Sequence, residues 1–174
     1  MRKIVKAMRK VIYLRDQSNF KRYINNLLEK VDFTPIVNIV PKEIKNITFV
    51  IPGMPAFSGG HTSILRLGTE LSKKGYNVGY VSFAPQNIED MRKNAEINLT
   101  NYKGNIIGDD VKKVKSDIVI ATSWESVYYS REMSGYKMYF IQDYEPYFNL
   151  YGESYIMAQK SYEVGYHMVS LGKW

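Results

Sequence analysis

The chain has 174 residues, of which 45% are hydrophobic and 14% aromatic, and its mean hydropathy is −0.32. This length allows one sizeable core but not two large domains, and the composition is that of a globular protein. The chain has no cysteine, which excludes disulfides, thiolate nucleophiles and cysteine-based zinc sites. No apolar run reaches the roughly 18 to 20 residues of a transmembrane helix, and no signal peptide is evident, so we expect a cytoplasmic protein.

The net charge of +7 is concentrated at the N-terminus. Residues 1–45 hold 11 Lys or Arg against 4 Asp or Glu, whereas residues 46–174 hold 13 of each kind. A protein that recognises nucleic acid is expected to carry its basic surface on the folded domain. The neutral balance of residues 46–174 therefore predicts no nucleic-acid partner.

Residues 1–45 are predicted to form a basic helical arm and a linker. Apolar residues recur at helical spacing up to Lys30, while Lys and Arg fill the other faces, and Pro35 and Pro41 favour an extended linker. A basic amphipathic helix can lie on an anionic membrane surface or pack across a domain with its charges in water. The pattern in Met1 to Arg15 fits both interpretations.

The next segment has the pattern of a strand, a helix and a second strand. Ile47 to Ile51 is rich in β-branched and aromatic residues, and Val78 to Phe83 repeats that pattern. Between them, apolar residues recur at helical spacing after Ser58-Gly59-Gly60, until Gly75 ends the helix. Glycines at the start of such a helix allow a ligand close to the backbone, and the free N–H groups favour an anion.

Strands and helices alternate over the rest of the chain. The predicted strands are 105–107, 118–121, 137–142 and 167–171, and the predicted helices are 88–93, 109–115, 124–131 and 153–164. This alternation predicts an α/β fold, a Rossmann-like parallel sheet with helices on both faces, over residues 46–174. Ligands of such a sheet bind at the carboxyl ends of its strands.

The glycine-rich loop from Gly53 to Gly60 matches neither of the two best-known phosphate-binding patterns. It lacks the Gly-Lys-Ser/Thr of a P-loop and the G-x-G-x-x-G of dinucleotide folds. The second strand runs into Ala84-Pro85, with no acidic residue to bind a ribose hydroxyl, so we expect no nicotinamide or flavin cofactor. The glycines either serve a ligand or only permit a turn.

His61 follows the two glycines and is a candidate on the same side of the site, although a lone histidine there is often only a polar surface residue. Two histidines and no cysteine give little support to a zinc site, and we expect no metal. Acids and aromatic rings meet in the stretch from Tyr139 to Phe148. Sugar rings pack on aromatic faces while carboxylates accept their hydroxyl hydrogens, which is typical of a saccharide site. The candidates are Asp143, Tyr144, Glu145 and Tyr147, with Trp124 and Glu125 expected near the same edge.

The order of strand, Pro52-Gly53, Ser58-Gly59-Gly60 and helix resembles the amino-terminal half of family-4 glycosyltransferases of the GT-B type. More narrowly, YFIQDYEPYF (139–148) and YEVGYHMVSLGKW (162–174) are similar to rhamnosyltransferases that build bacterial S-layer and rhamnan-type glycans. The resemblance covers residues 46–174.

The resemblance implies a two-domain enzyme whose facing halves enclose donor and acceptor. This half would recognise a saccharide or a lipid-linked glycan acceptor, while a second domain would hold the nucleotide-sugar donor, such as dTDP-rhamnose, without a cofactor. Ser58, Gly59, Gly60 and His61 would face the donor, and Trp124, Glu125, Asp143, Tyr144, Glu145 and Tyr147 would face the acceptor. We expect the chain alone to be inactive, as a fragment or a component of a split enzyme, and the resemblance indicates no catalytic residue in this half.

Two other functions remain open from the sequence. One is a non-catalytic carbohydrate-binding or assembly subunit that pairs with a separate donor-binding chain. The other is a Rossmann module for a small molecule unrelated to sugars.

Overall fold

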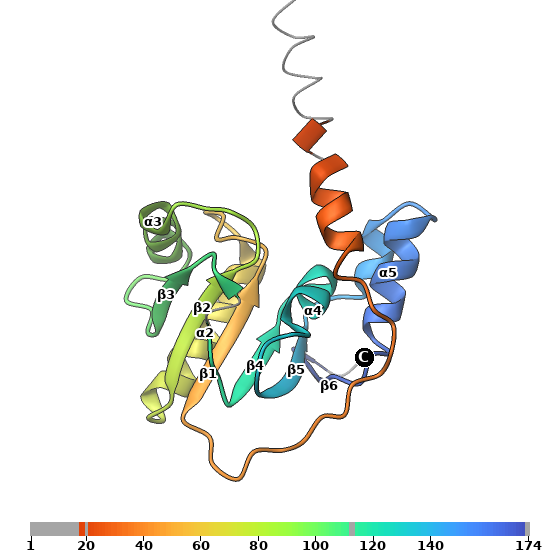
Figure 1. The fold of residues 1–174 in the computed structure, drawn as a ribbon. Helices are drawn as coiled ribbons and strands as arrows, with labels where there is room; N and C mark the ends of the chain where they lie inside the picture. The colour runs from red at the N-terminus through yellow and green to blue at the C-terminus, as the bar shows by residue number, and fades with distance from the viewer. Residues whose placement is uncertain (1–17, 20, 112–113, 173–174) are drawn as a thin grey trace, which may run out of the picture. The chain divides into compact units, whose positions relative to one another are not determined.

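The computed structural model describes residues 18–19, 21–111 and 114–172 (Figure 1). Its contacts divide the chain into two compact units, residues 1–32 and 33–174. In the first unit, residues 21–28 are helical, whereas the predicted basic helix of Met1 to Arg15 lies outside the described residues. The segment 33–45, which was expected to be a linker, falls within the second unit.

The second unit contains a six-stranded sheet in which every pairing is parallel. The strands are β1 (Asn46–Ile51), β2 (Asn77–Ser82), β3 (Asn105–Gly108), β4 (Ile118–Ala121), β5 (Tyr136–Ile141) and β6 (His167–Ser170). Their order across the sheet is β3-β2-β1-β4-β5-β6. The predicted Rossmann-like α/β fold is confirmed.

The helices are α2 (Gly59–Lys73), α3 (Ile88–Asn98), α4 (Trp124–Ser130), the 3₁₀ turn η2 (Glu145–Phe148) and α5 (Glu153–Ser161). Their starts follow local capping chemistry, because the side chains of Ser58, Asn87 and Ser123 accept hydrogen bonds from the first turns of α2, α3 and α4. Helix α3 continues five residues beyond the predicted end at Lys93, to Asn98. The predicted helix 109–115 includes residues 112 and 113, which lie outside the described residues.

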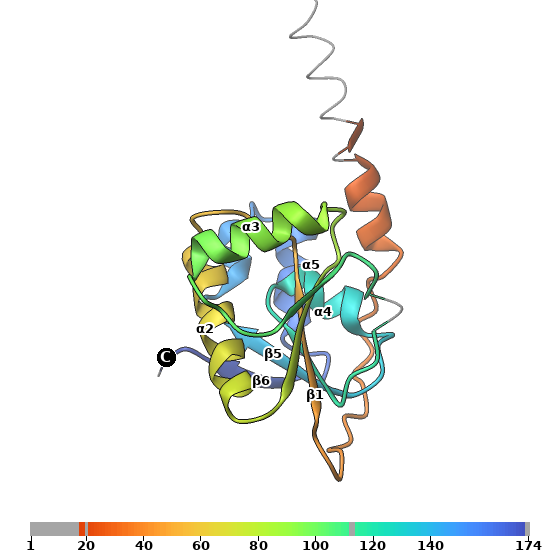
Figure 2. The same cartoon turned by 90° about the vertical axis from the view of Figure 1, so that its left-hand side faces the viewer.

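Alternate residues of the strands form two cores on opposite faces of the sheet. On one face, Ile47, Phe49 and Ile51 pack against Ile64 and Leu65 of α2. On the other face, buried residues of β4, α4 and β5 and of the segment after α5 form a second cluster. Its members are Ala121, Val127, Tyr139, Ile141, Val164 and Tyr166. Figure 2 shows α2 and α4 on opposite sides of β1. Helices therefore lie on both faces of the sheet, as is usual for parallel sheets, while all four residues of the edge strand β6 are exposed.

The strand order reverses between β1 and β4, which are neighbours in the sheet although two strands separate them in the sequence. The connections leaving these strands run to opposite faces, and a crevice forms at such a point in doubly wound folds. Thr122, directly after β4, donates its hydroxyl hydrogen to the carbonyl of Val50 in β1, 2.8 Å away. The candidate site is therefore sought at the carboxyl edge, where the C-terminal ends of the strands lie.

Candidate functional site at the carboxyl edge

The loop from β1 to α2 is held by amide side chains from the next crossover. Gln86 forms two hydrogen bonds with the backbone of Met54, accepting from its N–H at 2.6 Å and donating to its carbonyl at 3.1 Å. Asn98 of α3 donates to the carbonyl of Pro55 and accepts from the N–H of Ser58. These bonds tie the loop to α3 and to the segment before it, and so position the start of α2.

His61 is part of the same support. Its Nε2 lies 2.8 Å from the carbonyl oxygen of Gly53, which only accepts, so Nε2 carries the proton and Nδ1 accepts from the Ser58 hydroxyl at 2.8 Å. Burial lowers the pKa of His61, which favours this neutral form. The expectation that His61 faces a donor is not supported by this arrangement, because both ring nitrogens are occupied inside the loop. We assign His61 and Ser58 a positioning role.

Gly59 and Gly60 occupy the first two positions of α2. The first bond of the helix runs from the N–H of Thr62 to the carbonyl of Ser58, so the N–H groups of both glycines precede it. A Cβ on Gly59 would meet no atom within 4 Å, whereas a Cβ on Gly60 would lie 3.0 Å from Oε1 of Gln142. We call Gly59 and Gly60 the diglycine turn. Its first residue is open, whereas the side chain of Gln142, which follows β5, covers its second.

Four tyrosines form a ladder that runs outward from the core after β5. Tyr139 is buried, its ring lies 5.3 Å from Tyr162, Tyr162 lies 5.4 Å from Tyr144, and Tyr144 lies 4.8 Å from the largely exposed Tyr147. The hydroxyl of Tyr162 donates to the carbonyl of Asp143 and accepts from the N–H of Glu145. This tyrosine ladder therefore orders the turn that carries the acids.

A pocket of about 320 Å³ opens beside the ladder, at the ends of β5 and β6. Its lining residues are Ile141, Tyr144, Tyr162, Met168 and Ser170. Asp143 is not part of this lining, but it precedes Tyr144 and is exposed, with Oδ1 accepting from the N–H of Tyr144 at 2.8 Å. The volume is at the lower end of the roughly 300–1,000 Å³ of ligand pockets, and aromatic faces beside a carboxylate suit a polyhydroxylated ring.

Glu145 joins the acidic turn to the start of α4. One carboxylate oxygen accepts from the Tyr139 hydroxyl at 2.6 Å and the other accepts from the backbone N–H of Trp124 at 3.0 Å. Burial raises the pKa of Glu145 to about 7, although these two hydrogen bonds favour the charged form. Trp124 itself is buried. Both residues were expected to face an acceptor, but their contacts indicate that they hold the edge together.

The remaining predicted residues differ in exposure. Tyr147 is 77% exposed on η2, and Glu125 is half-buried in the first turn of α4. Among the candidates, the structure brings Asp143, Tyr144 and Tyr147 together as accessible groups. Among the residues that the structure describes, no group of three His, Asp or Glu side chains could hold a metal ion.

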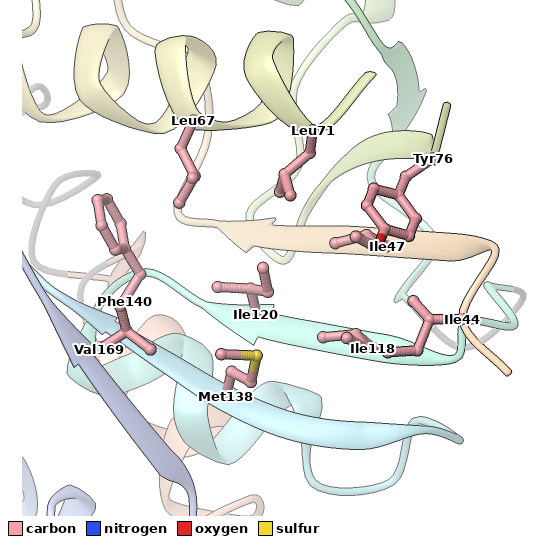
Figure 3. Close-up of a pocket in the computed structure, with 10 residues that line it drawn as sticks. All are labelled: Ile44, Ile47, Leu67, Leu71, Tyr76, Ile118, Ile120, Met138, Phe140 and Val169. Atoms are coloured by element: carbon pink, nitrogen blue, oxygen red, sulfur yellow. The ribbon is translucent and has the colours of Figure 1, made fainter. Parts of the chain in front are cut away.

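A second pocket, of about 270 Å³, lies on the α2 face of the sheet (Figure 3). Its walls come from α2, from β1, β4, β5 and β6 and from two residues outside them: Ile44, Ile47, Leu67, Leu71, Tyr76, Ile118, Ile120, Met138, Phe140 and Val169. The Tyr76 hydroxyl is the one hydrogen-bonding side-chain group in this lining. Such a surface cannot orient a sugar, which needs several polar partners, so this pocket is not the candidate site.

Sequence patterns did not reveal several residues that shape the site. Gln142, Gln86, Asn94 and Asn98 act through long-range hydrogen bonds or contacts, and amide side chains carry no local signature of such partners. Tyr162 lies in a stretch that resembles rhamnosyltransferases, which is the one signal that could have drawn attention to it.

No protein-family model matches this chain, and no curated protein matches it. Among the described residues, no helix combines the length and apolar character that a membrane span needs.

Proposed function

We propose that this chain is the acceptor-side domain of a nucleotide-sugar-dependent glycosyltransferase, specifically a rhamnosyltransferase of cell-surface polysaccharide synthesis. The observation that carries the proposal is the contact between the diglycine turn and the end of β5, where Gln142 lies over Gly60. This contact brings the two stretches that resemble glycosyltransferases to the same edge of the sheet.

The acceptor would bind at the pocket beside the tyrosine ladder. The face of Tyr144 offers an apolar surface to one side of a sugar ring, and the exposed carboxylate of Asp143 can accept hydrogen bonds from its hydroxyls. Rhamnose carries a methyl group where most hexoses carry a hydroxymethyl group, so a pocket that includes Ile141 and Met168 suits it.

The donor would be held mainly by a second domain facing this edge. The open backbone at Gly59 and the positive end of the α2 dipole would lie next to its diphosphate. Closure of the two domains would exclude water and align the reacting groups, and these effects supply most of the rate in such a design. In this proposal the basic segment Met1 to Arg15 holds the enzyme at the inner face of the cell membrane, near a lipid-linked acceptor.

The test is a titration of the chain, followed by NMR, with methyl rhamnoside, dTDP-rhamnose, NAD and ATP. We expect methyl rhamnoside to shift resonances of Tyr144 and Ser170, and Tyr144→Ala or Asp143→Asn to weaken its binding at least tenfold. Tyr155→Ala is the matched control, because Tyr155 is also half-buried against another ring but lies outside the pocket.

The outcomes separate the rival functions. Preferential binding of NAD or ATP would identify a Rossmann module unrelated to sugars, which the strand order β3-β2-β1-β4-β5-β6 also allows. Rhamnoside binding without transfer, when a donor and a donor-binding domain are supplied, would identify a non-catalytic carbohydrate-binding subunit.

A further inference from the structure

The two edges of the sheet differ in how they are protected from pairing with another chain. At one edge, the pairing of β3 with β2 is interrupted by a shift of register, and two acids, Asp109 and Asp110, follow the strand directly. Bulges and charges of this kind keep an edge strand from binding a further strand. The edge at β3 is therefore protected.

The strand at the opposite edge, β6, has neither device. It pairs with β5 in one uninterrupted register from His167 to Ser170, and β5 is its only partner among the strands that the structure describes. Residues 164–172 contain no Asp, Glu, Lys, Arg or Pro. An edge strand directs backbone N–H and C=O groups outward, and another extended strand binds such a row of groups in regular order. The backbone of β6 therefore favours an extended strand as its partner.

Apolar side chains reach this edge on both faces of the sheet. Met168 is 43% exposed, Val169 36% and, just after the strand, Leu171 58%. Val169 lines the apolar pocket on the α2 face, next to Phe140 of β5 (Figure 3), whereas Met168 and Ser170 line the pocket beside the tyrosine ladder. Both pockets therefore extend to the edge of the sheet at β6.

The residues of β6 are compatible with a second copy of the same strand. In an antiparallel pair centred on Val169, this residue lies opposite its equivalent in the second copy. Met168 then lies opposite Ser170, and His167 lies opposite Leu171. Opposite residues share a face of the sheet, so the apolar Val169 side chains meet and no two charged side chains of one sign face each other. Such a pair has a twofold axis, which is the commonest symmetry of protein oligomers.

We propose that β6 pairs with β6 of a second copy of this chain in antiparallel orientation, so that two six-stranded sheets join into one continuous sheet. The pairing brings Met168 and Ser170 of the second copy to the β6 side of the pocket beside the tyrosine ladder. It depends neither on sugar binding nor on the transfer reaction proposed above.

The experiment uses single cysteine substitutions in the full chain, which has no cysteine of its own. Residues directly opposite in an antiparallel pair have Cα atoms about 4.5–5.5 Å apart, a distance that a disulfide can span. We expect Val169→Cys to form a disulfide-linked dimer on mild oxidation at least tenfold faster than the matched control Met168→Cys, whose cysteine lies opposite Ser170. Light scattering of the unsubstituted chain should show dimers whose proportion rises with protein concentration.

Charged variants test the same register without oxidation. Val169→Lys and Val169→Glu should each weaken dimerisation at least tenfold, because like charges then lie opposite each other, and an equal mixture of the two variants should restore it. The control is Ile107→Lys on the opposite edge strand, where the side chain is 41% exposed, and it should dimerise within twofold of wild type.

Each outcome decides for or against the pairing. A wild-type chain that stays monomeric at the highest soluble concentration would overturn the proposal and leave β6 to a strand of another protein. Dimers that both charged variants leave intact, or equal rates of cross-linking for the two cysteine variants, would overturn it as well. If the charged variants do not fold, hydrogen exchange of the wild-type chain decides, since the amides of residues 168–170 should exchange more slowly as concentration rises and unchanged exchange would contradict the pairing.

Discussion

The side-chain amide of Gln142 lies so close to Gly60 that a Cβ on Gly60 would come within 3.0 Å of Oε1. Gln142 directly follows β5 and Gly60 is the second residue of α2, so two segments that are 82 positions apart in the sequence meet at the carboxyl edge. A side chain at Gly60 would therefore have to displace the Gln142 amide, whereas Gly59 has open space around it.

Replacing these two glycines by alanine should give different results. Gly59→Ala should raise the free energy of unfolding by roughly 0.5–1 kcal/mol, because alanine restricts the unfolded chain and favours the helix. Gly60→Ala should gain less, since the new methyl group must displace Gln142. Chemical denaturation measures both. In the double variant Gly60→Ala, Gln142→Ala, the gain in free energy of unfolding from alanine at position 60 should be restored. Equal gains from Gly59→Ala and Gly60→Ala alone would contradict the contact.

Asn98 should be the most important of the amides that hold the β1–α2 loop. Asn98→Ala leaves the carbonyl of Pro55 and the N–H of Ser58 without their side-chain partner, and should lower the free energy of unfolding by about 1–2 kcal/mol. Hydrogen exchange at Ser58 should also accelerate. Asn94→Ala is the comparison, because the Met54 carbonyl that it bonds keeps Gln86 as a donor. Equal losses from the two variants would contradict this account.

Glu145 should make stability depend on pH near neutrality. Burial raises its pKa to about 7, so the folded state binds the proton more tightly than the unfolded chain, whose pKa is 4.5. The free energy of unfolding should therefore fall as pH rises from about 4.5 to 7. Glu145→Gln should remove that fall, while Glu153→Gln on the exposed start of α5 should retain it. Denaturation curves at pH 5 and pH 7.5 test the difference.

Lys137 should make the free energy of unfolding rise with pH in the alkaline range, which is the opposite of the dependence expected for Glu145. Its side chain is buried in β5, where the ammonium group donates to the carbonyls of Met133 and Gly135, and burial lowers its pKa to about 8. The unfolded chain then binds the proton more tightly, so the contribution of Lys137 to stability should rise between pH 8 and pH 9.5. The difference between wild type and Lys137→Met, followed by chemical denaturation, should grow in favour of wild type over that range. A constant difference would show that Lys137 does not titrate there.

The sequence alone determined the order and type of the main elements. Short continuous apolar runs rich in β-branched residues, such as Ile118 to Ala121, and helical spacing after Ser58 depend on local geometry and burial, which a linear pattern records. The alternation of these elements was sufficient to predict a parallel sheet, because right-handed crossovers leave few other topologies. It also indicated that Gly59 and Asp143 follow the carboxyl ends of strands.

The tertiary structure decided which of those residues are available to a ligand. His61, Trp124 and Glu145 looked like site residues because of their chemistry. In the structure, His61 bonds the loop that carries it, Glu145 bonds the Tyr139 hydroxyl and the Trp124 backbone N–H, and the Trp124 side chain is buried. Gln142 and Asn98 gained their roles from the fold, which brings segments far apart in the sequence together: Gln142 lies over Gly60, and Asn98 bonds the Ser58 N–H. A hydrogen bond between distant residues leaves no periodic trace in the sequence, so only the folded chain shows whether a polar group holds the site together or faces the solvent.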